Sequence, residues 1–285
     1  MNKDSAVADR TAGDHFIARS VAERLQQARH LIVDLDGTLI REDEVLDGAA
    51  ALLERFRGRF VIVSNNSTHT AEGVARRLSR LGLKVAPSCI VLAGEESVAY
   101  LRRAHPQARI LLAGSAALRR HAMACGCQLV KSEADIVLLA LDPHFNRARL
   151  GLIVNQLRRG ARLVATNADA SHPGPDGSVV PETGALLAAV VTASGVQPLR
   201  VVGKPGPLLL EEGLRRLGAS PASTLVIGDN PDTDARGALQ LGMDCLLVGG
   251  AAGSPSLAGL LRGTVTAPGA AAVAVAKPPE RSRPA

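Results

Sequence analysis

The chain has 285 residues, a length that favours two domains, and its apolar fraction of 46% is enough for a sizeable core. Its formal charge of +6 favours anionic partners, yet it has no Trp, one Tyr and four Phe. Without aromatic side chains on which bases stack, we interpret the basic residues as a solvated surface and expect no nucleic-acid partner. Phosphorylated small molecules also suit the sign of this charge.

Membrane and secreted proteins are disfavoured as well. No apolar run approaches the ~20 residues of a membrane span, and the first residues lack the apolar core of a secretion signal. The four cysteines show neither zinc nor redox spacing: Cys89, Cys125, Cys127 and Cys245. We therefore expect reduced thiols in a cytoplasmic protein without a membrane partner.

Between the two ends of the chain, short β-rich runs alternate with helical patterns. The expected strands are Leu31–Leu35, Phe60–Ser64, Ile90–Leu92, Arg109–Ala113, Ile136–Leu141, Arg162–Thr166, Arg200–Val202, Thr224–Gly228 and Cys245–Val248. The expected helices are Ala49–Arg57, Ala71–Leu81, Ser97–Ala104, Ala116–Cys125, Asn146–Arg159, Gly184–Ser194, Pro207–Leu217 and Asp232–Leu241. This alternation predicts an α/β fold whose parallel sheets are covered by helices on both faces.

Four of the expected strands end in a polar cluster: Asp34-Leu35-Asp36, Ser64-Asn65-Asn66, Gly203-Lys204-Pro205 and Gly228-Asp229-Asn230. Because ligands bind at the carboxyl ends of parallel strands, we expect these clusters to form one site. The second and third clusters lie far apart in the sequence. We therefore expect a discontinuous core, residues 25–105 and 198–262, interrupted by an inserted α/β cap, residues 106–197.

The two ends complete this expected organisation. Residues 1–24 look like a polar arm that is partly disordered, and the Ala/Pro-rich residues 263–285 look like a disordered tail. Within the cap, the segment from Asn167 to Glu182 is expected to be a functional loop because it is long and rich in Gly and Pro.

The residue types in the four clusters suit phosphoryl transfer. Asp34 and Asp229 are hard oxygen donors of the kind that hold Mg²⁺. Ser64 offers a hydroxyl group to a phosphate, and the amides of Asn65 and Asn66 are expected to point at its oxygens near a helix start. A lysine, Lys204, would neutralise the charge of a phosphoryl group.

Two acids separated by one residue have complementary uses in such a reaction. Asp34 is interpreted as the nucleophile, which forms an acyl phosphate that water then cleaves. Asp36 is interpreted as the acid that protonates the leaving oxygen and then activates the water.

At this point the sequence resembles a known family. The residues that carry the resemblance are Asp34-Leu35-Asp36-Gly37-Thr38, Ser64-Asn65-Asn66-Ser67-Thr68, Ala165-Thr166-Asn167-Ala168-Asp169, Gly203-Lys204-Pro205 and Gly228-Asp229-Asn230-Pro231-Asp232-Thr233-Asp234. They look like the four motifs of the haloacid dehalogenase (HAD) superfamily and, in detail, those of its NagD-like, p-nitrophenyl-phosphatase-like group. The resemblance covers roughly residues 29–262.

The resemblance implies a Rossmann-like, doubly wound core with an inserted α/β cap. It implies Mg²⁺ held by Asp34, the backbone carbonyl of Asp36 and Asp229, with Asp234 acting on the metal indirectly. It also implies that Asn167 and Asp169 of the cap loop face the substrate. By analogy with the family, the caps would pair two chains into a homodimer.

The favoured function is an Mg²⁺-dependent phosphatase of a small phosphorylated metabolite. A phosphotransferase or phosphomutase on the same fold remains open, as does a binding protein whose site has decayed. The substrate is also open among sugar phosphates, phosphoglycolate, nucleotides, pyridoxal phosphate and p-nitrophenyl phosphate.

Overall fold

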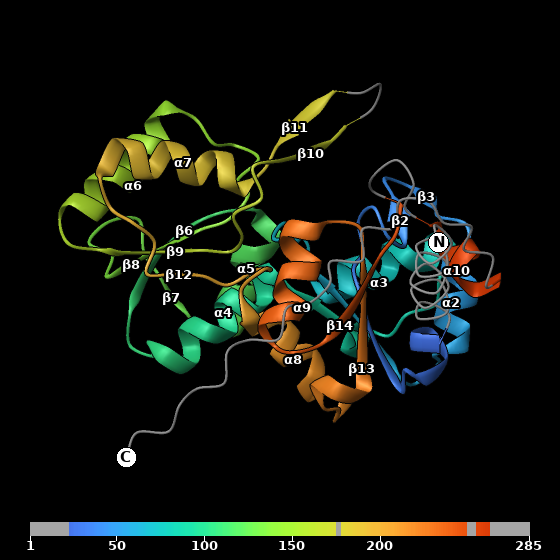
Figure 1. The fold of residues 1–285 in the computed structure, drawn as a ribbon. Coiled ribbons are helices and arrows are strands. Elements are labelled where there is room, and N and C mark those ends of the chain that lie inside the picture. Colours follow the sequence, from blue (N-terminus) through green and yellow to red (C-terminus); the bar gives the residue numbers. More distant parts are fainter. Residues whose placement is uncertain (1–22, 175–177, 250–254, 263–285) are drawn as a thin grey trace, which may run out of the picture.

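The computed structural model describes residues 23–174, 178–249 and 255–262, so almost all of the expected arm and the whole expected tail lie outside the described residues (Figure 1). Its first sheet has the strand order β14-β13-β1-β4-β5, and every pair is parallel. These strands are β1 (His30–Val33), β4 (Phe60–Ser64), β5 (Ile90–Leu92), β13 (Thr224–Gly228) and β14 (Asp244–Leu247).

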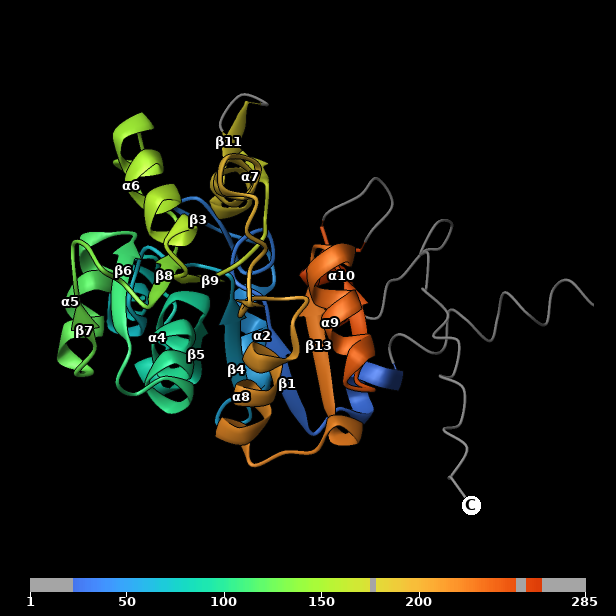
Figure 2. The ribbon, with the colours of Figure 1, turned by 90° about the vertical axis from the view of Figure 1, so that its left-hand side faces the viewer.

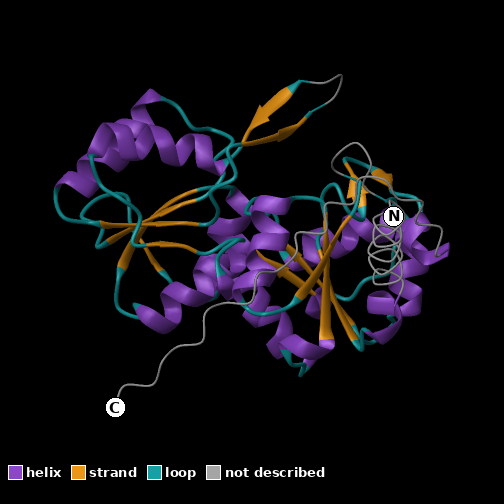
Figure 3. Ribbon diagram, viewed as in Figure 1, coloured by secondary structure: helices purple, strands orange, loops and turns teal. Residues whose placement is uncertain are grey.

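The second sheet has the order β12-β9-β8-β6-β7, again with parallel pairs only. Its strands are β6 (Arg109–Ala113), β7 (Gln128–Leu129), β8 (Ile136–Leu139), β9 (Arg162–Ala165) and β12 (Arg200–Val201). Figure 3 shows the two sheets as separate groups of strands with helices around them. The expected α/β class with parallel sheets is confirmed.

In the described residues, eight helices fall where the apolar periodicity predicts them, with shifts at the ends, and a further one, after β14, was not predicted. They are α2 (Ala49–Arg55), α3 (Ala71–Arg80), α4 (Ala93–Ala104), α5 (Ala116–Ala124), α6 (Arg147–Arg158), α7 (Thr183–Ser194), α8 (Pro207–Leu217), α9 (Arg236–Gln240) and α10 (Leu257–Arg262). Helix α4 begins four residues before the predicted start. Its first residues are small enough to pack closely, since a Cβ on Gly94 would lie 3.0 Å from the Cα of Ser67.

The described part of the chain also contains three short helical turns. They are the 3₁₀ turns η1 (Pro87–Cys89) and η3 (Pro221–Ser223) and the π-helical turn η4 (Pro231–Ala235). The last of these replaces the first turn of the helix predicted from Asp232, and α9 follows it directly. None of the helices in the described ranges has the length and apolarity that crossing a membrane requires.

Apolar residues of both sheets are buried on both faces, which explains the nearly continuous hydrophobic strands. A first cluster joins one face of the first sheet to α2 and α3, and a third joins one face of the second sheet to α6 and α7. A second cluster contains residues from both sheets and from α4 and α8, including Ile32, Val63, Leu101, Leu112 and Leu210. The two sheets therefore share a hydrophobic core.

Two hairpins were not predicted. One joins β2 (Ile40–Arg41) to β3 (Glu44–Val45), and the other joins β10 (Ser171–Pro173) to β11 (Val179–Pro181). The second lies within the segment that we expected to be a loop, and Figures 1 and 2 show it projecting beyond the helices. Strands of two or three residues carry too little alternation to be recognised in a sequence.

The strand pairing bears on the expected division of the chain. The predicted boundary at residue 197 precedes β12, yet β12 pairs with β9 of the second sheet. We therefore propose that the cap extends to Val201 and that the core resumes with the segment before α8.

Candidate active site

Three carboxylates from two neighbouring strand ends lie together. Asp34 follows β1, Asp229 follows β13 and Asp234 lies in η4. One oxygen of each lies within 4.8 Å of the other two. The parallel register places Val33 beside Ile227, and the Asp34 amide donates to the Ile227 carbonyl at 2.8 Å. The two strands therefore end at the same level, as sequence reasoning requires.

Lys204 inserts its ammonium group into this cluster from the connection between β12 and α8. Its Nζ donates to Asp34 Oδ1 at 2.5 Å, to Asp234 Oδ1 at 2.7 Å and to the Val63 carbonyl at 3.0 Å. Lys204 is only 3% exposed and Asp234 only 1%. All three ammonium protons are thus used inside the protein.

Glycines make room for these carboxylates. Gly37 has a φ of +84°, and a Cβ at this position would overlap the Asp229 carboxylate. A Cβ on Gly228 would similarly overlap the carboxyl group of Asp234. The glycines of two sequence motifs are therefore needed for close approach, and Gly37 is also needed for its left-handed backbone.

The electrostatics of the cluster show an excess of negative charge. Burial raises the pKa of Asp34, and the nearby Asp234 and Asp229 raise it further. Burial and Asp234 raise the pKa of Asp229 to about 6. Burial alone would lower the pKa of Lys204, but Asp234 and Asp34 outweigh it and raise that pKa, so the lysine stays protonated. One lysine does not balance three carboxylates.

This donor set fits a divalent cation. Carboxylate oxygens are the ligands that Mg²⁺ prefers, and a cation would remove the repulsion between them. Asp34, Asp229 and Asp234 each offer one oxygen to such an ion. Both oxygens of Asp34 and of Asp234 already accept hydrogen bonds, those of Asp34 from Lys204 and Thr38 and those of Asp234 from Lys204 and the Asn230 amide. The indirect role expected for Asp234 therefore stays a prediction.

Asp36 and Ser64 lie next to each other at this edge of the sheet. The Ser64 hydroxyl donates to Asp36 Oδ2 at 3.4 Å and accepts from the Asn66 amide at 3.1 Å. Asp36 is exposed by its surface area, but the surrounding protein desolvates its carboxyl group and thereby raises its pKa. The positive charges of Arg77 and Lys204 lower this pKa in part. The Asn66 side chain closes the following turn by accepting from the amides of Thr68 and His69.

Asn65 connects the two sheets. Its Oδ1 accepts from the Lys204 amide at 2.7 Å, and its Nδ2 donates to the Lys204 carbonyl at 3.0 Å and to Asp169 Oδ2 at 2.9 Å. The same Asp169 oxygen accepts from Asn167 at 2.9 Å. The side chains of Asn65, Asn167 and Asp169 are thus brought together, and their hydrogen bonds are with one another, with the Lys204 backbone and with the Thr166 hydroxyl.

Sequence reasoning missed residues that surround these groups. Thr38 is buried and donates to Asp34 Oδ2 at 3.4 Å, although its motif was recognised. Arg77 of α3 donates to Asp43 at 3.1 Å and to the Glu42 carbonyl at 2.6 Å, and its charge acts on Asp36. The charge of His172 from β10 also acts on Asp36. Arg77 lies outside any recognisable motif, so only the three-dimensional structure identifies it, whereas His172 lies in the segment from Asn167 to Glu182 that was expected to be functional.

The family follows from sequence and structural similarity. A model of haloacid dehalogenase-like hydrolases matches residues 31–128, and a HAD-hydrolase-like model matches residues 201–268. The glycerol phosphate phosphatase of Mycobacterium tuberculosis, whose crystal structure contains magnesium, is 32% identical with a TM-score of 0.73; the match covers 80% of this chain and 70% of that one. The chain belongs to the haloacid dehalogenase-like hydrolases.

Further relatives place this family member in the expected group. The 4-nitrophenylphosphatase of Thermotoga maritima is 28% identical with a TM-score of 0.75, over 80% of this chain and 88% of that chain. NagD of E. coli is 25% identical with a TM-score of 0.73, over 81% and 98%. The dihydroxyacetone phosphatase of Corynebacterium glutamicum is 29% identical over 76% of this chain and 79% of its own length. The chain is thus a phosphatase-type hydrolase of the NagD-like group, which confirms the expected enzyme class.

Proposed function

We propose that this HAD-like hydrolase is an Mg²⁺-dependent phosphatase of a small phosphorylated metabolite. The observation that carries the proposal is the convergence of Asp34, Lys204, Asp229 and Asp234 in one buried cluster, with Ser64 and Asp36 beside it. These side chains, at the carboxyl edge of the first sheet, supply the nucleophile, acid, cation and hydroxyl donor that the proposed phosphoryl transfer would use.

The residues take the following roles in the proposed reaction. An oxygen of Asp34 attacks phosphorus and forms an aspartyl phosphate, while Asp36 gives a proton to the leaving oxygen. Asp36 then takes a proton from the water that hydrolyses the intermediate. Lys204 holds the Asp34 carboxylate in position and offsets negative charge, and Ser64 donates to a phosphate oxygen.

The metal would be held by Asp34, Asp229 and the backbone carbonyl of Asp36, with Asp234 orienting the set through Lys204. When bound, Mg²⁺ would neutralise phosphate charge and help to align the phosphoryl group with the nucleophile. The amides of Asn65 and Asn66 are proposed as further phosphate contacts. The Asn66 amide already donates to Ser64, so it would have to exchange partners.

The proposed substrates are small sugar and polyol phosphates. Relatives at comparable identity are named as dihydroxyacetone, acid sugar and glycerol phosphate phosphatases, which supports this class. The near absence of aromatic residues disfavours a base-stacking cap. Asn167 and Asp169 are proposed to shape the cap side of the site. A cytoplasmic location and a cap-to-cap homodimer stay predictions.

The direct test is turnover of p-nitrophenyl phosphate and a panel of sugar phosphates with Mg²⁺. We expect release of inorganic phosphate without an acceptor, and we expect Asp34→Asn to abolish it while circular dichroism shows a folded protein. A phosphotransferase would release phosphate only when an acceptor is present, and a binding protein with a decayed site would release no phosphate. Full activity in Asp34→Asn would remove the proposed nucleophile.

A further inference from the structure

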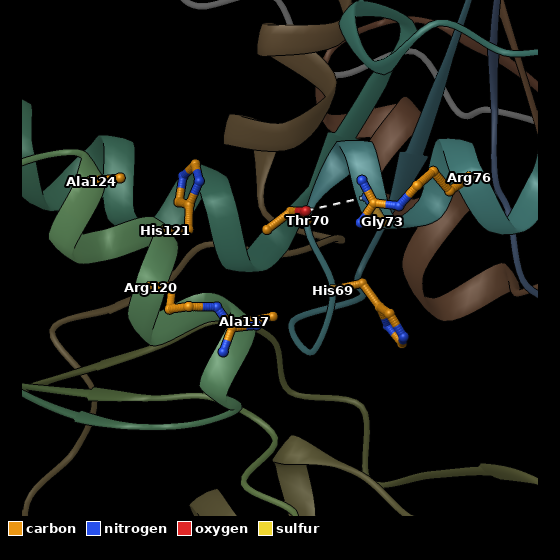
Figure 4. A pocket seen from close by; sticks show the side chains of 8 residues that line it. All are labelled: His69, Thr70, Gly73, Arg76, Ala117, Arg120, His121 and Ala124. Carbon is orange, nitrogen blue, oxygen red and sulfur yellow. Dashed lines mark hydrogen bonds between the residues drawn. The ribbon is translucent and has the colours of Figure 1, made fainter.

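A pocket outside the carboxylate cluster lies between α3 and α5. Its volume is about 410 Å³, within the range of small-molecule sites. Four basic side chains line it: His69, Arg76, Arg120 and His121. In Figure 4 the Arg76 side chain extends from α3 toward α5, and the Arg120 side chain extends from α5 toward α3. The two guanidinium groups therefore face a common space.

Neither arginine of the pocket has a side-chain hydrogen bond or ion pair within the described residues, whereas Arg77 binds Asp43. Arg80 and Arg119 of the same helices are likewise without such a partner there, but they do not line the pocket. No acidic residue lines the pocket. Glu95 lies 3.5 Å from His121 Nδ1, and the same Glu95 oxygen also accepts from the Ala71 amide. The positive charge of the pocket is thus left unneutralised at its centre.

Three of the remaining lining residues are small and leave space for a ligand. Gly73, Ala117 and Ala124 carry small or no side chains. A Cβ on Gly73 would have only ordinary contacts, at 3.5 Å from Thr70 Oγ1 and 3.9 Å from His69 Cβ. Burial and the charge of Arg77 lower the pKa of His69, so this ring offers hydrogen bonds at neutral pH and the arginines supply the charge.

We propose that this pocket binds a small polyanion, such as a metabolite with two phosphate groups or a phosphate and a carboxylate. Guanidinium groups bind such oxyanions through paired, charge-assisted hydrogen bonds, and two arginines on opposite walls suit two anionic groups. The pocket shares no lining residue with the carboxylate cluster. It adjoins the proposed active site through His69, whose amide donates to Asn66 at 3.0 Å and whose ring feels the charge of Asp36.

The position of the pocket gives the ligand a structural effect. Helix α3 packs in the first hydrophobic cluster through Val74 and Leu78, while α5 packs in the second through Leu118 and Ala122. Thr70, the N-cap of α3, follows the turn that starts at Ser64. A polyanion held by Arg76 and Arg120 joins these two helices and stabilises the folded chain.

The test is calorimetric titration of the full chain with inorganic pyrophosphate in EDTA, so that metal-dependent binding and hydrolysis are absent. We expect saturable binding and a rise in the melting temperature. Arg76→Ala combined with Arg120→Ala should weaken binding about tenfold or more. The matched control is Arg80→Ala combined with Arg119→Ala, which removes the same charge from the same two helices outside the pocket and should leave affinity within about twofold.

A second variant tests the shape of the site without changing its charge. Ala117→Leu places a larger side chain in the pocket and should also weaken binding, while Asp34→Asn should not. Absence of binding at millimolar pyrophosphate would overturn the proposal. Equal losses in the two double variants would do the same, because they would show that only overall charge attracts the anion.

Discussion

Asn65 donates a 2.9 Å hydrogen bond to Asp169, and this contact joins the turn after β4 of the first sheet to the segment after β9 of the second. Asn65 also hydrogen-bonds to both the amide and the carbonyl of Lys204. It therefore links the cap to the lysine that holds Asp34. Alignment of the proposed catalytic groups therefore depends on a contact between the two sheets.

A double-mutant cycle tests this link. We expect Asn65→Ala and Asp169→Ala each to lower kcat/KM. In the free energy of unfolding we expect a coupling of about 1.5 kcal/mol between them, because each single variant already loses the hydrogen bond to the charged group and the double variant loses no more of it. Urea unfolding of the four proteins measures the coupling. Additive effects would show that the two side chains act independently.

Removing the Lys204 ammonium should strongly destabilise the protein. Lys204→Met leaves Asp34 and Asp234 buried without their partner, and we expect a loss of roughly 3–5 kcal/mol in the free energy of unfolding, together with loss of activity. Lys84→Met, at an exposed lysine, is the control and should be nearly neutral. Chemical denaturation measures both. A stable Lys204→Met protein would mean that the carboxylates do not depend on this lysine.

Gly37→Ala should abolish phosphatase activity because the added methyl group would overlap the Asp229 carboxylate. Gly58→Ala is a matched control, since Gly58 also has a positive φ, +73°, but no atom lies within 4 Å of its added Cβ. It should show only the backbone strain of about 1–2 kcal/mol and keep its activity. If both variants stay active, the space at Gly37 has no catalytic importance.

Stability in acid should depend on Glu212 of α8. Its hydrogen bonds with Arg215, together with those from Arg216, lower its pKa from 4.5 to about 2. A lowered pKa stabilises the fold above the unfolded value, and this contribution disappears as the pH falls from about 4.5 to about 2. Glu212→Gln should therefore lose less stability than the wild type across this window. Glu211→Gln, at an exposed neighbour on the same helix, is the control, and urea unfolding at several pH values measures the stability of all three proteins.

Metal removal tests the proposed Mg²⁺ site through both phosphate release and thermal stability. We expect EDTA to abolish phosphate release and Mg²⁺ to restore it. Mg²⁺ should also raise the melting temperature of the metal-free protein, because it binds only the folded carboxylate cluster. Asp229→Asn should reduce this rise, whereas Asp232→Asn, an exposed acid of the same segment, should retain it. A Mg²⁺-independent enzyme would contradict the proposed site.

The strand ends were predictable because buried parallel strands have long apolar runs that stop at polar residues, as at Asp34 and Ser64. The convergence of these residues with Lys204 was predictable from the order of the motifs. The hairpin from Ser171 to Pro181 was not, since strands of three residues leave little periodicity. The sequence predicted a phosphate contact for the Asn65 amide, but it indicated neither the contacts of the Asn65 side chain nor the role of Arg77, because their partners lie on segments distant in sequence.

The hydrophobic cluster shared by the two sheets also matters for protein engineering. Residues such as Leu112 of β6 and Ile32 of β1 belong to one continuous apolar group. Deleting the middle segment of the chain, or replacing it with the corresponding segment of a relative, would expose apolar surface on the remaining part and promote aggregation. Chimeras of this enzyme should therefore exchange the inserted segment together with the apolar side chains on which it rests.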